Sequence, residues 1–225
     1  MILRTADFDF DLPESFIAQE PLEPRDSARL MVLDRTTGHI EHRVFREIGE
    51  YLHAGDVLVL NQTRVLPARL FARKETGGRV ELLLLRRLDE RTWECLAGGK
   101  GLKAGRSLKL EDGLEARILV EGEGAKRIVQ FSRSLDEILP HIGHVPLPPY
   151  IRRPLSDPER YQTVYARVQG SAAAPTAGLH FTPYLLEALQ AKGVHLAYLT
   201  LHIGLDTFAP VTEESPLEHK MHTEW

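Results

Sequence analysis

The sequence has little cysteine, few aromatic residues and no long apolar run. Cys95 is the one cysteine in 225 residues, which excludes an intrachain disulfide. No apolar stretch approaches the ~20 residues that a membrane helix needs. Residues 1–10 lack the apolar centre of a signal peptide. These absences predict a cytoplasmic protein that does not associate with membranes.

Two histidine pairs have a spacing that is compatible with metal binding. His141 and His144 are separated by two residues, and so are His219 and His222. Neither pair has a cysteine nearby to complete a ligand set. The sequence therefore predicts no metal site.

Charge is close to balanced overall but unevenly distributed. The formal net charge is −4, which argues against a generally basic nucleic-acid-binding protein. Residues 61–160 carry 19 Lys and Arg against 14 Asp and Glu, whereas the remainder carries 9 against 18. This basic middle could place one face against phosphates, although a solvated surface of mixed charge explains it equally well.

The first 66 residues have the pattern of an α/β protein. Residues 29–34 and 40–45 predict a hairpin around Thr37-Gly38. Residues 57–60 are all apolar, which predicts a central strand buried on both faces. Asn61 to Arg64 follow directly at the carboxyl end of this strand, where ligands of open α/β sheets bind.

A series of short strands with turn signals between them follows. It predicts a small β-barrel or sandwich with strands at residues 70–74, 80–88, 93–97, 107–110, 114–120 and 126–131. Residues 145–158 contain five prolines, which exclude a helix or a central strand and indicate a return crossover. We therefore expect an α/β body with a mixed or parallel sheet, formed by residues 1–66 and 148–225, and an inserted all-β barrel domain, residues 67–147.

The most informative stretch is residues 170–183, in which small residues lead into a predicted helix. Thr182 suits the N-cap, Pro183 suits the first helical position, and Gly193 ends the helix. Exposed amides before a helix form a site for an anion or a carboxylate. On composition alone, a tight apolar loop that only packs explains the same stretch equally well.

Two histidines lie close to this predicted site. His180 precedes the N-cap by two residues, and His202 lies near the end of a predicted apolar strand, residues 194–203. Placed together at one sheet edge, they would form an acid/base pair. A lone histidine on an apolar strand is more often a core residue, which is the role we assign to His195.

Long ungapped segments resemble the S-adenosylmethionine:tRNA ribosyltransferase-isomerase family. The segments are NQTRVLPARL (61–70), PPYI (148–151), YQTVYA (161–166), GSAAAPTAGLHFT (170–182), LHIGLDTF (201–208) and HKMHTEW (219–225). The chain departs from the family pattern at Asp206, where Gly is usual, at Ala209, where Arg is usual, and at Thr223, where Ser is usual. Family members continue beyond this C-terminus, so the catalytic body is expected to be incomplete.

The resemblance implies a specific reaction. The co-substrate is S-adenosylmethionine, with no tightly bound cofactor, and its ribosyl unit moves to 7-aminomethyl-7-deazaguanine at the wobble position of a tRNA with a GUN anticodon. Adenine and methionine leave, and epoxyqueuosine forms. A monomer is expected.

The resemblance also implies the site residues. His180 and His202 are the catalytic candidates. The substrate-binding candidates are Arg64, Arg69, Tyr150, Arg153, Tyr161, Gln162, Thr163, Gly170, Ser171, Ala174, Pro175, Thr176, Gly178, Thr207, His222 and Glu224.

Two other functions stay open. A methyltransferase that uses the same co-substrate would normally show a Gly-rich turn after the first strand and an acidic residue after the second, and we find neither pattern. A non-catalytic fragment that binds the anticodon would show a steep salt dependence and no adenine release.

The role of His180 is open to a direct test. If His180 removes or donates the proton in this reaction, His180→Ala in an active full-length enzyme abolishes adenine release. Adenine release at the normal rate would show that the assigned role is wrong.

Overall fold

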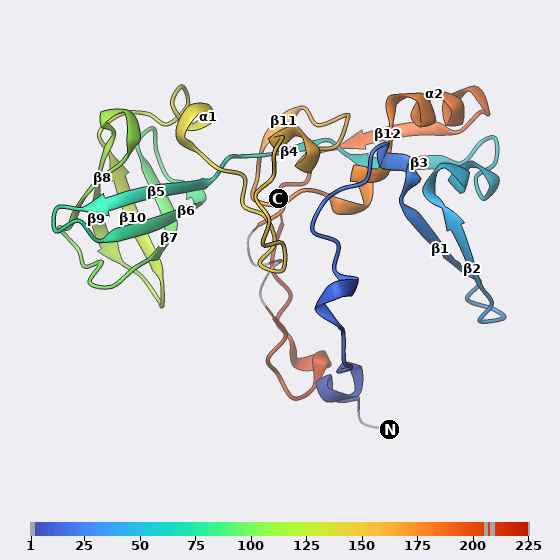
Figure 1. The fold of residues 1–225 in the computed structure, drawn as a ribbon, viewed down its shortest axis with the longest axis horizontal. Helices are drawn as coiled ribbons and strands as arrows, with labels where there is room; N and C mark the ends of the chain where they lie inside the picture. Colours follow the sequence, from blue (N-terminus) through green and yellow to red (C-terminus); the bar gives the residue numbers. More distant parts are fainter. Residues whose placement is uncertain (1–2, 205–206, 208–209, 225) are drawn as a thin grey trace. The chain divides into compact units, whose positions relative to one another are not determined.

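The computed structural model describes residues 3–204, 207 and 210–224 (Figure 1). The chain divides into two compact units. One comprises Met1–Arg64 and Pro148–Trp225, and the other comprises Val65–Leu147. Each unit has its own hydrophobic core. The family departures at Asp206 and Ala209 lie outside the described residues.

Six antiparallel strands form a closed barrel in the second unit, in the order β10-β7-β6-β5-β8-β9. Each predicted strand begins and ends within one residue of an observed one, which confirms the predicted barrel. The strands are β5 (Arg69–Lys74), β6 (Arg79–Arg87), β7 (Thr92–Gly98), β8 (Ser107–Lys109), β9 (Glu115–Glu121) and β10 (Lys126–Phe131).

The barrel is filled by alternate residues of its strands. In β5, Leu70 and Ala72 point into the core, whereas Phe71 and Arg73 face solvent. Each fully buried leucine contributes about 1.5–3 kcal/mol relative to an exposed one. The short helix α1 (Leu139–Ile142) adds two apolar side chains to the same core.

Outside the barrel unit, the described residues form three two-stranded sheets, the helix α2 and several 3₁₀ helices. β1 (Arg29–Leu33) and β2 (Ile40–Val44) make the predicted antiparallel hairpin. β3 (Val57–Asn61) pairs in parallel with β12 (His195–Leu199), and β4 (Thr63–Val65) pairs with β11 (Val168–Ser171). The parallel pair and the barrel confirm the predicted fold class.

The 3₁₀ helices are η1 (Thr5–Phe8), η2 (Glu14–Phe16), η3 (Arg25–Ser27), η4 (Phe45–Glu50), η5 (Glu111–Gly113), η6 (Pro158–Tyr161), η7 (Thr176–His180) and η9 (Pro216–Glu218).

Helix α2 (Pro183–Ala191) begins as the sequence predicts. The Thr182 hydroxyl accepts a hydrogen bond from the backbone N–H of Leu185 at 3.1 Å, which satisfies one donor of the first turn. Leu185, Leu186 and Leu189 are buried and face the core of the first unit. None of the described helices is both long and apolar enough to span a bilayer.

The prediction that residues 57–60 are buried on both faces is wrong. Val57 and Val59 are each 58% exposed, whereas Leu58 and Leu60 face the core. The described part of this sheet has two strands, and the core that contains α2 covers one of its faces.

The partner strand is also shorter than predicted, because β12 ends at Leu199. Beyond it, the side-chain amide of Asn61 takes the place of a strand partner. Its Nδ2 donates to the Leu201 carbonyl at 2.8 Å, and its Oδ1 accepts from the Leu201 N–H at 3.1 Å.

A close backbone contact in the second unit generates a stability prediction. A Cβ at position 143 would lie 2.2 Å from the carbonyl oxygen of Pro67 and 2.6 Å from that of Leu139. Gly143→Ala therefore lowers the free energy of unfolding by about 1–3 kcal/mol in urea titrations. Gly98→Ala is the matched control, since its nearest neighbour would be 3.7 Å away. Equal losses in the two variants would contradict the steric explanation.

Candidate functional site

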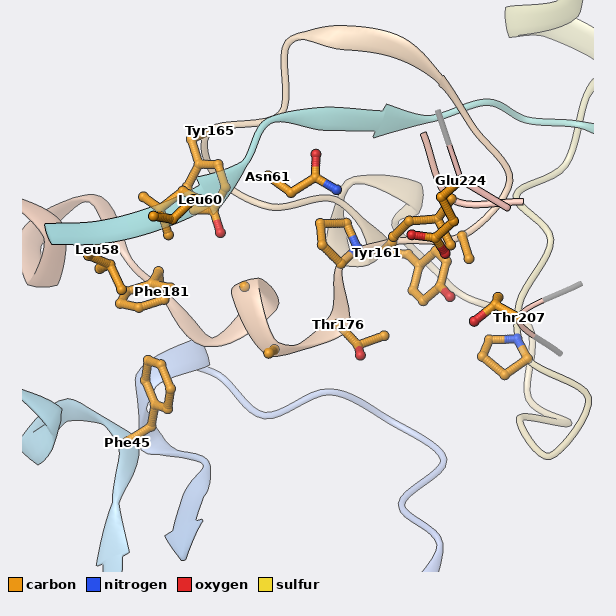
Figure 2. A pocket seen from close by; sticks show the side chains of 18 of the residues that line it. Phe45, Leu58, Leu60, Asn61, Tyr161, Tyr165, Thr176, Phe181, Thr207 and Glu224 are labelled. Carbon is orange, nitrogen blue, oxygen red and sulfur yellow. The ribbon is translucent and has the colours of Figure 1, made fainter. Parts of the chain in front are cut away.

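A cleft of about 770 Å³ opens in the first unit (Figure 2). This volume is in the range of sites for small organic ligands. Its lining comes from the end of β3, the proline-rich segment before η6, the loop that contains η7, and the C-terminal segment. The residues are Phe45, Ile48, Leu58, Val59, Leu60, Asn61, Pro148, Pro149, Tyr150, Tyr161, Tyr165, Ala173, Ala174, Pro175, Thr176, Ala177, Gly178, Phe181, Ile203, Thr207 and Glu224.

The small-residue loop is fixed to the segment that follows β12. The buried Ser171 hydroxyl donates to the Ala173 carbonyl at 2.9 Å and accepts from the Ile203 N–H at 2.8 Å. The Ala172 N–H donates to the Ile203 carbonyl at 2.8 Å. Ser171 therefore holds the loop in place from behind, while Ala174, Pro175 and the residues after them line the cleft.

Two buried tyrosines stand against this loop. Burial raises the pKa of Tyr161 and of Tyr165 to about 12, so both hydroxyls stay protonated at neutral pH. A Cβ at Gly178 would lie 2.2 Å from the Tyr165 hydroxyl oxygen. Glycine at this position is what allows the ring of Tyr165 to reach the loop.

One carboxylate faces the cleft. Of the described residues that line it, Glu224 alone has a carboxylate, and none is a lysine or arginine. Glu224 Oε1 lies 3.1 Å from Nε2 of His222, which orients the carboxylate. The charged side chains of the described lining therefore favour a cation over an anion.

The two predicted catalytic histidines lie in different surroundings. His202 is held by the fully buried Thr63, whose hydroxyl lies 2.8 Å from Nδ1, and its ring lies directly over Gly170. The next residue, Ile203, lines the cleft. Gly170 has φ +150°, and a Cβ there would lie 2.6 Å from the imidazole ring, so this close approach needs glycine.

His180 borders a second, smaller cavity of about 220 Å³, together with Leu22, Arg25 and Arg160. Its ring centroid lies 5.2 Å from that of Phe45, a residue that lines the main cleft. Neither histidine is among the described residues that line the main cleft, and His180 but not His202 is among those of the smaller cavity.

The predicted arginine contacts have intramolecular partners. Arg64 forms an ion pair with Glu159, Arg69 with Glu81 at 3.1 Å, and Arg153 with Glu20 at 2.6 Å. None of these arginines lines the cleft. Gln162 and Thr163 are buried, whereas Tyr150 is about half exposed and lies in the lining.

Arg25 has a structural role that the sequence did not reveal. Its guanidinium donates to the carbonyls of Gln162 at 2.6 Å, Glu159 at 2.8 Å and Leu179 at 3.3 Å. Burial lowers its pKa. Phe45, Tyr165 and Phe181 also line the cleft without a sign in the sequence, because an aromatic residue in an apolar segment gives no signal that separates a cleft wall from a core.

The fold and the cleft define the class of protein, an α/β body with an inserted β-barrel and a cleft of the size that small organic ligands occupy. The profile of the family described as "Queuosine biosynthesis protein" matches residues 5–225. The chain is 56% identical over 228 residues to the S-adenosylmethionine:tRNA ribosyltransferase-isomerase of Desulfitobacterium hafniense, with 99% of this chain and 67% of that protein covered. It is 53% identical to the proteins of the same name from Thermotoga maritima and Clostridioides difficile, with the same coverage.

A crystal structure of S-adenosylmethionine tRNA ribosyltransferase from Thermotoga maritima matches with 43% identity and a TM-score of 0.37, over 88% of this chain and 58% of that one. The chain spans about two thirds of the length of the curated relatives that it matches. It belongs to the queuosine biosynthesis protein family. This membership confirms the family and the class of enzyme that the sequence predicts, and it does not favour a methyltransferase.

The contact between Gly178 and Tyr165 can be tested by a double-mutant cycle. Gly178→Ala lowers the free energy of unfolding by about 1–3 kcal/mol, because the new methyl group meets the Tyr165 hydroxyl. Tyr165→Phe removes that oxygen, so adding it to Gly178→Ala restores part of the loss. Additive effects of the two substitutions in chemical unfolding would rule out the contact.

Proposed function

We propose that this chain performs the reaction of its relatives. The ribosyl unit of S-adenosylmethionine is transferred to the aminomethyl nitrogen of 7-aminomethyl-7-deazaguanine, at the wobble position of a tRNA with a GUN anticodon. Adenine and methionine are released, and the ribosyl unit rearranges to the epoxycyclopentane of epoxyqueuosine. The observation that carries this proposal is the cleft of about 770 Å³, whose walls come from the segments that resemble the family.

The charge of the cleft supports S-adenosylmethionine as its ligand. The sulfonium is a cation, and Glu224 is the one carboxylate among the described lining residues, without a lysine or arginine beside it. The aromatic faces of Tyr150 and Tyr161 add further attraction for a cation. The small-residue loop allows the nucleoside to lie close to the backbone.

We propose Glu224 as the group that removes the first proton. The positive sulfur acidifies the hydrogen on the adjacent ribose carbon, and a carboxylate oriented by His222 can accept that proton. The departing adenine gains a proton, and the neutral hydroxyls of Tyr161 and Tyr165 are donors in the same cleft. His180 and His202 stay candidates for the acid or the base.

The remaining parts of the proposal concern the RNA and the setting. The modified base must leave the anticodon stack to react, and the half-exposed ring of Tyr150 offers a surface for it. We also propose that the chain acts in the cytoplasm, where its substrate tRNA is found, and that it acts as a monomer.

The decisive measurement is adenine release from labelled S-adenosylmethionine in the presence of tRNA that carries the precursor base. Glu224→Gln keeps the shape of the side chain and removes its charge, so kcat for adenine release falls about 10²- to 10⁴-fold. Glu218→Gln, on the exposed part of the same C-terminal segment, is the control and leaves kcat unchanged.

The alternatives give different outcomes in the same assay. Normal release by Glu224→Gln together with lost release by His202→Ala or His180→Ala would assign the proton transfer to that histidine. Tight binding of tRNA without any adenine release would identify a non-catalytic anticodon-binding chain. Methylated tRNA in place of free adenine would identify a methyltransferase.

A further inference from the structure

Three like charges lie side by side on the outer face of the barrel. In the strand register, Arg73 of β5 is directly opposite Lys109 of β8 on one side and Arg79 of β6 on the other. Like charges in opposed positions destabilise a sheet. Among the described residues, none of the three forms a salt bridge or a side-chain hydrogen bond. On its other side, Lys109 is directly opposite Glu115 of β9.

These cations border a groove on the barrel surface. The groove has a volume of about 660 Å³, and its lining includes Lys74 in addition to the three cations of the row. Two carboxylates, Glu75 and Glu111, also line it, so cations outnumber anions. A groove of this charge attracts a polyanion.

An exposed aromatic ring lies in the same groove. Phe71 is 48% exposed and lies two residues before Arg73, on the same face of β5. Its ring centroid is 5.0 Å from that of His144, which is also exposed. Cations beside an open aromatic face are the two elements that proteins use to hold single-stranded nucleic acid, since cations contact phosphates and rings stack on bases.

The described lining of the main cleft has no lysine or arginine. We therefore expect the ionic contacts to the phosphates of an RNA substrate on another surface. The groove on the barrel has both the charge and the ring that the cleft lacks.

We propose that the outer face of β8, β5 and β6 (Figure 1) is an RNA-docking surface. Arg73, Arg79 and Lys109 contact successive phosphates of an unpaired segment, and Phe71 stacks on one of its bases. The identity of the RNA as tRNA rests on the proposed function. The assignment of the surface to RNA rests on its charge and its exposed ring. Repulsion within the cationic row is relieved when the phosphates bind.

The test is direct binding of the full chain to a fluorescent anticodon stem-loop RNA at several salt concentrations. Arg73→Ala/Arg79→Ala removes two phosphate contacts, so the slope of log K against log[salt] becomes shallower by about 1.5. Phe71→Leu keeps an apolar side chain and removes the ring, so affinity falls about tenfold with the salt slope unchanged.

A matched control lies on the opposite side of the barrel. β10 is three strands from β5 in either direction around the closed sheet. Lys126 begins β10, and the carbonyl of Arg91, the residue before β7, accepts a hydrogen bond from the N–H of Phe131 at the other end of β10. Arg91→Ala/Lys126→Ala therefore removes two exposed cations that do not line the groove. This control keeps both the affinity and the slope of the parent chain. Thermal unfolding shows whether a loss of RNA affinity comes from a loss of folding. Arg73→Ala/Arg79→Ala relieves repulsion in the row, so we expect its Tm to be unchanged or higher.

Several results would overturn the proposal. They are equal effects of the groove and control variants, an unchanged affinity in Phe71→Leu, and no RNA binding by the parent chain. Displacement of the RNA by an acidic peptide, with no dependence on Phe71, would identify an acidic protein as the partner.

Failure of this proposal is distinguishable from failure of the proposed function. Binding is measured without turnover, so an RNA that binds through Phe71 and Arg73 while no adenine is released supports the docking surface alone. If the chain releases adenine at the normal rate, and the groove variants have the same KM for tRNA as the parent chain, the proposed reaction is supported and the docking surface is not. If both hold, the variants raise KM for tRNA and leave kcat at saturating tRNA unchanged.

Discussion

The candidate site depends on the hydrogen bonds that fix the small-residue loop to the segment after β12. Small residues give a loop little packing of its own, so without external bonds it would sample many conformations. The buried Ser171 hydroxyl and the Ala172 N–H bind both polar groups of the Ile203 backbone, while Asn61 binds both polar groups of Leu201. These contacts place the loop, the end of β3 and the residue after His202 around one cleft.

Under the two proposals, charge assigns two chemically different substrates to two surfaces. The described lining of the cleft is largely apolar with one carboxylate, which suits a sulfonium, whereas the groove on the barrel carries exposed cations that phosphates would contact. If cations lined the cleft, they would repel the sulfonium and attract the RNA backbone to the reacting centre. The excess of basic residues in residues 61–160 is compatible with this assignment, and also with a solvated surface of mixed charge.

Sequence patterns predicted the fold well where the environment of a residue is set by the residues next to it in the sequence. Alternation and turn signals gave the barrel strands, and Thr182-Pro183 gave the start of α2, because those signals act within a few residues. The burial of residues 57–60 was mispredicted, since the number of faces that a core covers is a tertiary property. The resemblance to the family supplied Tyr161 and Glu224 as candidates, but the wall formed by Phe45 and Tyr165 depends on contacts distant in sequence.

The barrel surface illustrates why alternation alone does not explain an exposed aromatic residue. Period-two geometry requires the side chain between Leu70 and Ala72 to face outward, yet it does not require that side chain to be a phenylalanine. The same argument applies to Arg73, because any polar residue would satisfy the outer face without repelling Lys109 and Arg79. Repulsion within the cationic row opposes stability of the free chain, and a ligand that binds both the cations and the ring accounts for the two choices together. A polyanion with unpaired bases is such a ligand, because its phosphates neutralise the cationic row and its bases cover the ring.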